Sequence, residues 1–573
     1  MMLPSLWLLA LTPVLAIWPK PSSLETGDST LWIKSQLAVT YNGKNLPWQF
    51  GYEPKGPQSS SIEIVRGGVS RAMDTIVNKN FVPWMLYERM ALETTEPSLS
   101  KPKTFVKSLT IKQTKADTPA TFKPQDGDVD ESYSLEVDET GKATIEAVSS
   151  TGVLHALESF TQLFYQHSQG SFFYTKSAPV TITDKPEYEH RGILLDVARG
   201  YLPVASILRA IDGAAYNKMN RVHIHFTDSQ SWPLEIPSMP ELHEKGAYAR
   251  GKTYTPSDLA QIQQYAVNRG IEPIIEIDTP GHIGVVALSH PDIIAGWNSW
   301  PWSSYCAEPP CGQLRLNESK VDPFLDKLMD DLLPRVSPYS TYFHTGGDEV
   351  NFNMYTLDPS VGTNDSAVIV PLLQKFIDKH HARVRKAGLT PLVWEEIPAD
   401  YNITIGKDVV VQSWLGDAAI ESLTAQGHKV ITSNSNFLYL DCGRGQWLNF
   451  PPVDVPAFTP FLDWCNPYKN WRLIYSYDPR ANLTAEQAKL VIGGEVGGWS
   501  ETIDDANLDD ILWPRSSAAS EIFWSSPEGR NQLDAAPRLA EFRERLIARG
   551  IRSANVHMPF CTQGLNATAC EFV

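Results

Sequence analysis

The last two thirds of the chain alternate short apolar runs with amphipathic segments. Eight of these runs have the length and the branched apolar side chains of buried strands. The segments between them include helical patterns over residues 204–220 and 257–270, each ending near an Asn or Gly stop signal. The eight runs are GILLDV, RVHIHF, EPIIEI, TYFHTG, PLVWEE, DVVVQS, HKVITS and VIGGEV.

This repetition predicts an α/β fold, with a (β/α)8 TIM barrel as the catalytic domain over residues 187–573. The alternative is an open, doubly wound sheet. That fold would call for a Gly-rich phosphate-binding turn after an early strand, and the sequence has none.

The part of the chain that precedes the barrel shows two different patterns. Alternating runs and one helical pattern over 151–166 predict a small α+β domain over residues 104–186. Residues 17–103 are largely irregular, apart from a helical pattern over 61–81, and residues 93–103 have the composition of an exposed linker. We expect residues 17–103 to be either a pro-segment that packs on the rest or a loose N-terminal extension.

The first 16 residues form an apolar run that predicts a signal peptide cut near Ala16. A membrane anchor is the rival, but the run contains Pro4 and Pro13 and is shorter than the roughly 20 residues needed to span a bilayer. Five Asn-x-Ser/Thr sequons in polar stretches are typical of a glycosylated, secreted protein. They lie at Asn317, Asn364, Asn402, Asn482 and Asn566.

Six cysteines agree with secretion, because they form three couples that are close in sequence. Fifteen pairings are possible in principle, and the low cost of closing short loops favours pairing between neighbours. The spacing does not resemble that of a zinc site. The couples are Cys306 with Cys311, Cys442 with Cys465, and Cys561 with Cys570.

The net charge of −17 argues against partners such as nucleic acid or an anionic membrane. With 42% hydrophobic and 20% charged residues, the chain can bury a large core. The 17 tryptophans belong largely in that core, but a subset could wall a pocket that stacks on sugar rings.

Polar and aromatic residues follow the predicted strands at the end where a barrel carries its active site. Within the run FHTGGDEV, the Gly346–Gly347 pair lets the backbone turn, so that Asp348 and Glu349 can enter one pocket. Two adjacent carboxyl groups raise the pKa of one of them, and the resulting acid and anion suit cleavage of a glycosidic bond. The alternative for this run is a solvated turn.

From residue 104 onward the chain resembles the glycoside hydrolase family 20 β-N-acetylhexosaminidases, most closely the secreted fungal-type members. The order and spacing of the shared motifs carry the resemblance, and the segment before residue 100 is more weakly similar to the propeptide region of the fungal-type enzymes. The motifs are HRGILLDVARGYLP (190–203), NKMNRVHIHFTDSQSWPLE (217–235), IDTPGH (277–282), HTGGDE (344–349), VWEE (393–396), QSW (412–414), YLD (439–441) and GGEVGGWSE (493–501).

This resemblance implies an exo-acting hydrolase that removes terminal N-acetylglucosamine, with N-acetylgalactosamine as a second candidate sugar, from chitin oligomers or glycans. It implies retaining, substrate-assisted catalysis, in which the 2-acetamido oxygen of the substrate attacks C1 and forms an oxazolinium. Glu349 would be the general acid and base, Asp348 would hold the acetamido N–H, and Tyr439 would hold its oxygen.

The resemblance also implies binding roles for further residues. Trp394, Trp414 and Trp499 match residues that enclose the acetamido methyl group and the sugar ring. Arg191, Asp441 and Glu501 match groups that bind sugar hydroxyls, with Arg199 as a rival for Arg191. Asp228 and His282 match positions beside the acid that tune its proton. Glu395 and Glu396 receive no catalytic role.

A homodimer is suggested by the resemblance alone, as is a non-covalently bound propeptide, and no cofactor or metal is expected. Three alternatives stay open. The first is a relative that releases a disaccharide, the second a secreted carbohydrate-binding barrel without catalysis. The third is a metal-dependent hydrolase built on Asp278, His282 and Asp348, which lacks a His-rich ligand set.

Overall fold

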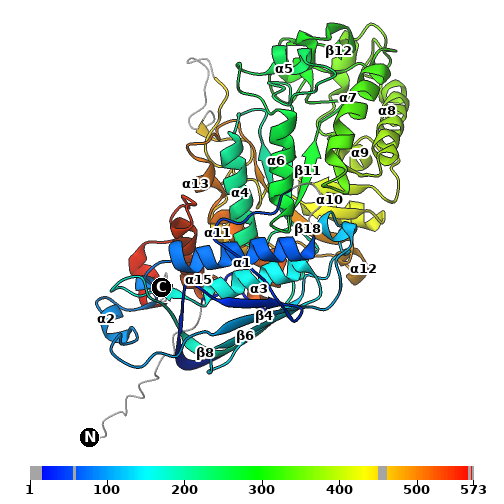
Figure 1. Ribbon diagram of the computed structural model, residues 1–573. Helices are drawn as coiled ribbons and strands as arrows, with labels where there is room; N and C mark the ends of the chain where they lie inside the picture. Colours follow the sequence, from blue (N-terminus) through cyan, green and yellow to red (C-terminus); the bar gives the residue numbers. More distant parts are fainter. Residues whose placement is uncertain (1–15, 56–59, 450–460, 566–569, 571–573) are drawn as a thin grey trace, which may run out of the picture.

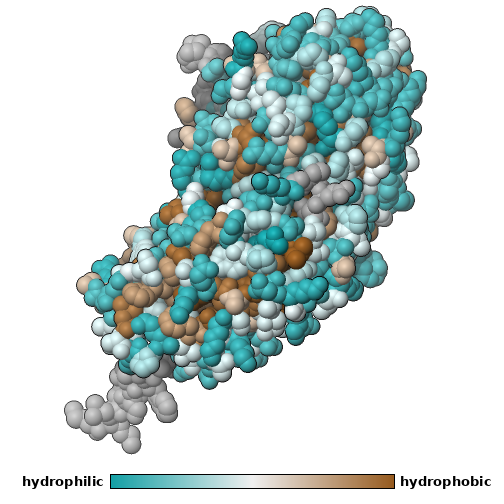
Figure 2. Space-filling view, viewed as in Figure 1, coloured by the Kyte–Doolittle hydropathy of each residue, from teal (hydrophilic) through white to brown (hydrophobic). Residues whose placement is uncertain are grey.

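The computed structural model describes residues 16–55, 60–449, 461–565 and 570. These residues form an N-terminal sheet domain, at the bottom of Figure 1, and a barrel that stands above it. Among them, no helix has both the length and the apolar character needed to cross a membrane. The face shown in Figure 2 is mostly hydrophilic, with scattered hydrophobic side chains.

Eight parallel strands close the barrel in the order β10-β11-β14-β15-β16-β17-β18-β9. They coincide with the eight runs expected from the sequence, so the prediction of a TIM barrel is confirmed. The strands are β9 (His190–Asp196), β10 (Arg221–His225), β11 (Glu272–Glu276), β14 (Tyr342–His344), β15 (Thr390–Trp394), β16 (Val410–Ser413), β17 (Lys429–Thr432) and β18 (Val491–Gly498).

Amphipathic helices surround the barrel because each buries one apolar stripe against the strands. In α4 the stripe is Ile207, Ala210, Ile211 and Ala214. Helix α6 begins with Pro256 after a capping box between Thr255 and Asp258. The principal barrel helices are α4 (Val204–Tyr216), α6 (Pro256–Val267), α7 (Val321–Val336), α8 (Ser366–Lys386), α10 (Asp417–Ala425), α11 (Trp471–Tyr475), α14 (Arg515–Ser525) and α15 (Gln532–Ala548).

The N-terminal domain contains an eight-stranded sheet with the order β1-β8-β5-β6-β4-β2-β3, in which β7 pairs with β8. In Figure 1, helices α1 (Ser61–Asn78) and α3 (Ser150–Gln162) lie between this sheet and the barrel. The strands are β1 (Ser23–Ile33), β2 (Ala38–Tyr41), β3 (Lys44–Asn45), β4 (Ser108–Gln113), β5 (Tyr133–Val137), β6 (Lys142–Ala147), β7 (Tyr165–Gln166) and β8 (Phe173–Asp184).

The expected division at residue 103 does not coincide with a structural boundary, because the sheet contains strands from both sides of it. Strand β1 pairs antiparallel with β8, and β2 pairs parallel with β4. The buried Trp18 donates its Nε1–H to the carbonyl of Ser517 in α14 at 3.0 Å. Residues 17–103 are therefore an integral part of the fold, and a cut between residues 93 and 103 stays a prediction.

Each cysteine pairs with its neighbour in sequence, as loop closure favoured: Cys306 with Cys311, Cys442 with Cys465, and Cys561 with Cys570. Four sequon asparagines, at 317, 364, 402 and 482, are exposed in turns or loops, where a glycan can be attached. The expected leader, apart from Ala16, and the sequon at Asn566 lie outside the described residues.

Candidate active site

A pocket of about 310 Å³ opens at the carboxyl ends of the barrel strands. Acidic and aromatic side chains from several strand ends and two inserted loops meet there. The lining residues are Arg199, His282, Trp302, Ala307, Glu308, Asp348, Glu349, Trp414, Tyr439, Asp441, Gln446, Trp447, Leu448, Trp464, Trp499 and Glu501.

The turn after β14 brings two adjacent carboxyl groups into this pocket. Gly346 has a φ of +70°, and a Cβ atom there would lie 1.7 Å from Oδ1 of Asp278. Glu349 itself has a φ of +51°, which an L-residue rarely adopts and which functional sites often hold. Asp348 and Glu349 therefore both line the pocket, although neighbouring residues of a regular strand would face opposite ways.

Asp348 lies beside a buried carboxyl group, that of Asp278. Their carboxylate oxygens and a ring nitrogen of His282 lie within 4.8 Å of one another. Burial and the charge of Asp348 raise the pKa of Asp278 well above its usual range. Burial also raises the pKa of Asp348, but His282 and a hydrogen bond with Asp278 oppose that rise. Asp278 thus keeps the proton of the pair, and Asp348 carries the charge.

His282 connects Glu349 to Asp228. Its Nε2 lies 3.1 Å from Oε2 of Glu349, and its Nδ1 lies 3.1 Å from Oδ1 of Asp228. Burial alone would lower the pKa of His282, but the charges of Asp228 and Asp348 outweigh it and raise that pKa well above its usual value. Asp228 does not reach the pocket, because it lies fully buried behind His282 and Arg199.

Aromatic rings form one wall of the pocket. Trp414 and Tyr439 lie nearly parallel, with an interplanar angle of 9° and ring centroids 6.1 Å apart. Trp499 packs against Tyr439, and Trp394 lies behind Trp499 rather than in the lining. The disulfide between Cys442 and Cys465 belongs to the same apolar cluster, so it ties the loop with Trp447 and Trp464 to this wall.

Unsatisfied polar atoms at the other side of the pocket suit the hydroxyl groups of a sugar. Asp441 Oδ1 and Glu501 Oε2 are buried without a hydrogen-bond partner within the described residues. Burial raises the pKa of Asp441 to about 7 and that of Glu501 well above its usual range. A ligand hydroxyl would remove the cost of leaving these atoms unpaired.

Arg191 does not belong to this site, so the sequence-based assignment is wrong. Its side chain is fully buried at the amino end of β9, where its NH2 lies 2.5 Å from Oε2 of Glu131 in the N-terminal domain. The rival candidate, Arg199, follows the carboxyl end of β9 and lines the pocket. Arg199 lies 3.0 Å from Asp228 and 3.9 Å from Glu501.

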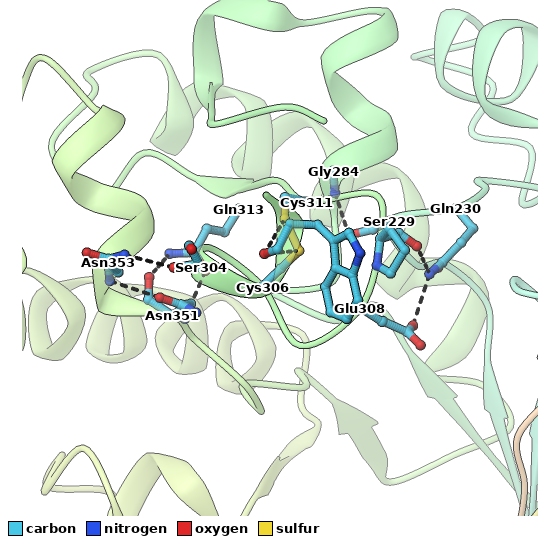
Figure 3. The surroundings of a disulfide bond; sticks show 12 residues. Ser229, Gln230, Gly284, Ser304, Cys306, Glu308, Cys311, Gln313, Asn351 and Asn353 are labelled. Carbon is cyan, nitrogen blue, oxygen red and sulfur yellow. Dashed lines mark hydrogen bonds between the residues drawn. A yellow bond between two sulfur atoms is a disulfide. The ribbon is translucent and has the colours of Figure 1, made fainter. Parts of the chain in front are cut away.

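Sequence reasoning missed Glu308, which lies on the short loop closed by Cys306 and Cys311 (Figure 3). Its Oε1 accepts hydrogen bonds from Nε of Arg199 and, at 2.9 Å, from Nε2 of Gln230. Two cysteines five residues apart could have pointed to Glu308, because a disulfide between them holds the short loop that they enclose in one conformation. Trp302, Trp447 and Trp464 were missed in the same way, since they lie on inserted loops.

The remaining acidic candidates have structural contacts. Glu396 accepts a hydrogen bond from Nε1 of Trp414 at 3.1 Å, and Glu395 accepts one from the backbone N–H of Leu415. The structure does bring Asp278, His282 and Asp348 together. Both ring nitrogens of His282 already face carboxylates, so a metal ion there would have to displace the contact with Glu349 or Asp228.

Comparisons with known proteins agree with this geometry. Residues 188–527 match the catalytic domain of glycosyl hydrolase family 20, and residues 17–163 match a domain described as beta-acetyl hexosaminidase like. The chain is 37% identical to a beta-hexosaminidase of Arthroderma benhamiae, over 97% of both chains. It is 34% identical to a chitooligosaccharidolytic beta-N-acetylglucosaminidase of Ostrinia furnacalis, over 76% of this chain and 74% of that one.

A solved structure gives the same result. The chitobiase of Flavobacterium johnsoniae superposes with a TM-score of 0.71 at 25% identity, over 94% of this chain and 73% of that one. The domain match at residues 17–163 crosses residue 103, in agreement with the continuous N-terminal sheet. The chain therefore belongs to glycosyl hydrolase family 20, and it is an enzyme of the β-N-acetylhexosaminidase type.

Proposed function

We propose that the enzyme cleaves terminal N-acetylhexosamine by retaining, substrate-assisted catalysis, with Glu349 as the acid and base. The carboxyl group of Glu349 lines the pocket and faces His282 at 3.1 Å. Glu349 would give its proton to the leaving oxygen as the glycosidic bond breaks. It would then take a proton from the water that opens the oxazolinium.

Asp348 and Tyr439 would hold the acetamido group in position for its attack on C1. The Asp348 carboxylate accepts the acetamido N–H and stabilises the positive charge that develops on the ring nitrogen. The Tyr439 hydroxyl donates a hydrogen bond to the acetamido oxygen, and the Trp414 and Trp499 rings enclose the methyl group. The observation that carries this proposal is the placement of Asp348, Glu349 and Tyr439 in one aromatic-walled pocket.

Cleavage from the non-reducing end follows from the polar side of the pocket. Arg199, Asp441 and Glu501 would bind the hydroxyl groups of the terminal sugar. Chitin oligomers and N-acetylglucosamine-terminated glycans are the proposed substrates, since relatives are described as chitooligosaccharidolytic. Release of a disaccharide is the second candidate, and a hydrolysis panel with chitobiose and longer oligomers separates the two by their products.

Secretion, a homodimer and a non-covalently held propeptide belong to the same proposal. The three disulfides and the exposed sequons support an oxidising route. If the chain is cut between residues 93 and 103, the fragment with β1 should stay bound, because β1 is paired along β8. Gel filtration and N-terminal sequencing of secreted protein test this, and recovery of a single N-terminus near residue 17 would remove the cut.

The decisive experiment for this function is Glu349→Gln, measured with two leaving groups. Chitobiose needs protonation of its leaving oxygen, so its kcat/KM should fall by about 10³-fold or more. With the N-acetylglucosaminide of dinitrophenol, the dinitrophenolate leaves without protonation, so the kcat/KM for this substrate should fall far less. Product binding, followed by tryptophan fluorescence, should persist. Equal losses for the two substrates, or unchanged activity, would remove Glu349 from its role.

A further inference from the structure

Behind the pocket, the barrel interior holds a chain in which imidazoles and carboxylates alternate. Asp228 Oδ2 lies 2.9 Å from Nε2 of His225, whose Nδ1 lies 2.6 Å from Oε2 of Glu276. The same oxygen of Glu276 lies 3.1 Å from Nε2 of His223. Nδ1 of His223 then lies 2.9 Å from Oε2 of Glu495. The chain therefore continues well beyond the residues that touch the pocket.

At its far end the chain reaches the N-terminal domain. Glu495 Oε1 lies 2.7 Å from Nε2 of His190, whose Nδ1 lies 3.2 Å from Oδ1 of Asp126. Asp126 precedes β5 and also pairs with Arg221 at 2.9 Å. The chain thus runs from Glu349, through His282, to the opposite end of the barrel, and its members are all buried except at the pocket.

The barrel strands supply this chain because alternate strand residues face the interior. In β10, His223 and His225 are two positions apart and therefore point to the same side. Strands β11 and β18 add Glu276 and Glu495 next to them. Barrel interiors are normally filled by layers of branched apolar side chains, so this half of the interior departs from the usual packing.

The contacts decide the charges along the chain. Both ring nitrogens of His225 face carboxylate oxygens, and a neutral imidazole would turn its lone pair toward an anion at one of them. The charged form alone donates to both. Burial lowers the pKa of His223, but Glu495 and Glu276 outweigh it and raise that pKa to about 9. His225 is therefore a cation held between two anions, and at His190 the contacts with Asp126 and Glu495 likewise outweigh burial and raise the pKa.

Stability does not call for such an arrangement. Removing ions from water costs several kcal/mol each, and apolar side chains of the same volume would usually be as stable. The series of ions meets solvent at Glu349, the group that must hold and release a proton in the reaction. The buried ions therefore have a function if they control the charge beside Glu349.

We propose that Glu276 is a positioning residue of the acid–base step. It holds His225 as a cation, and that cation fixes Asp228 as an anion, which in turn holds His282 beside Glu349. Glu276 does not line the pocket, and the ring of Trp394, which donates a hydrogen bond to it, lies behind Trp499 rather than in the lining. This inference rests on the proposed role of Glu349 and extends it to the interior of the barrel.

Other charged and polar groups face the chain near the pocket, and they remain in place when Glu276 is changed. Glu276 also receives a hydrogen bond from Nε1 of Trp394 and lies 3.0 Å from Nδ1 of His344. The groups around His282 and His225 are Arg199, Asp228, Asp278, Glu308, Asp348, Glu349 and the ring of Trp499.

The test is the pH profile of kcat/KM for Glu276→Gln. Without its second anion His225 becomes neutral, so a positive charge near Asp228 is lost together with a negative charge farther away. The potential at the Glu349–His282 pair becomes more negative, and the pair holds its proton more tightly. The alkaline limb should therefore move to higher pH, by about half a unit or more. KM at the optimum should change little.

The matched control is Glu272→Gln, which removes a buried carboxyl group from the other end of the same strand. Glu272 contacts Thr341 and Arg221 rather than a histidine of the chain. The alkaline limb of the pH profile of Glu272→Gln should coincide with that of the wild type. A folded Glu276→Gln enzyme with the wild-type limb, or an equal shift in both variants, would overturn the inference. A wild type without activity on N-acetylglucosaminides would instead overturn the proposed function.

A measurement on the unaltered protein covers the case in which Glu276→Gln does not fold. The whole protein has 13 histidines, which can be labelled with ¹⁵N in the imidazole ring. Nitrogen NMR at pH 8 should show rings protonated on both nitrogens, although a free histidine is neutral there. The Glu272→Gln protein should give the same signals. A spectrum in which every imidazole is neutral at pH 8 would overturn the inference.

Discussion

Glu349 and His282 face each other across 3.1 Å, and both hold a left-handed backbone, with φ values of +51° and +47°. Glu349 lies on the turn after β14, and His282 lies on the turn after β11. Non-glycine residues adopt this region at a cost, so the surrounding structure must impose it. The two turns aim an acid and a cation at one point in the pocket.

Because Arg199 rather than Arg191 lines the pocket, substitutions of these two arginines should have different effects. Arg199→Gln should lower kcat/KM by about 100-fold or more, because it removes a charged donor to the sugar and the partner of Asp228. Its thermal midpoint should change less than that of Arg191→Gln. Arg191→Gln should cost about 3 kcal/mol or more of folding stability, since the buried Glu131 loses its guanidinium partner and keeps only His155 and Asn220.

Kinetics and urea unfolding on the same two proteins check this. The folded fraction of Arg191→Gln should keep the wild-type kcat/KM. Wild-type kinetics for Arg199→Gln, together with an inactive but stable Arg191→Gln, would restore the original assignment.

Tyr439→Phe tests the positioning of the acetamido group. The variant keeps the ring that stacks on Trp414 but loses the hydroxyl, so KM should change little. The value of kcat should fall by about 10²-fold, as for loss of one preorganised donor. Steady-state kinetics on an aryl N-acetylglucosaminide measure both constants. An increase in KM at constant kcat would instead mean that the hydroxyl only binds substrate.

The Cys306–Cys311 disulfide should matter for binding rather than for chemistry. It holds the loop on which Glu308 contacts Arg199. With both cysteines changed to Ser, we expect KM to rise and kcat to change less, because the loop must then be ordered by the substrate. The Cys561 and Cys570 pair, changed in the same way, is the matched control and should leave KM unaltered. Equal KM values for both double variants would contradict this role.

The charged histidines of the barrel interior predict a pH dependence of stability. The pKa of His223 is about 9 in the folded chain and about 6.5 when unfolded. The contribution of His223 to the free energy of unfolding is therefore fully present below pH 6.5 and is lost as the pH rises through 9. The loss amounts to about 3 kcal/mol. Urea unfolding between pH 6 and 9 measures this. A stability that stays flat or rises over that range would be the contrary result.

The sequence predicted the barrel because its eight strands are short apolar runs that alternate with amphipathic segments, and parallel strands buried on both faces need such runs. It did not predict β1, since the run SLETGDSTLWI has few apolar residues and pairs with β8 about 150 residues later. A strand held by so distant a partner leaves little trace in the local pattern.

The site residues on strand ends could be predicted, whereas those placed by tertiary contacts could not. Arg191 lies at the amino end of β9 and Arg199 follows its carboxyl end, so the rule for barrel active sites selects Arg199 where the resemblance selected Arg191. Glu308 comes from a loop whose position depends on a disulfide. The series of histidines and carboxylates behind the pocket was invisible for a similar reason, because His223 on β10 and Glu495 on β18 meet only when both strands pair with β9.

The acetamido oxygen as nucleophile is tested most directly by substrates whose N-acetyl group carries zero, one, two or three fluorine atoms. Fluorine withdraws electrons from that oxygen without altering the leaving group. If the oxygen attacks C1, kcat/KM should fall steeply with each added fluorine while KM changes little. A rate that is the same for all four substrates would contradict substrate assistance and, with it, the roles of Asp348 and Tyr439.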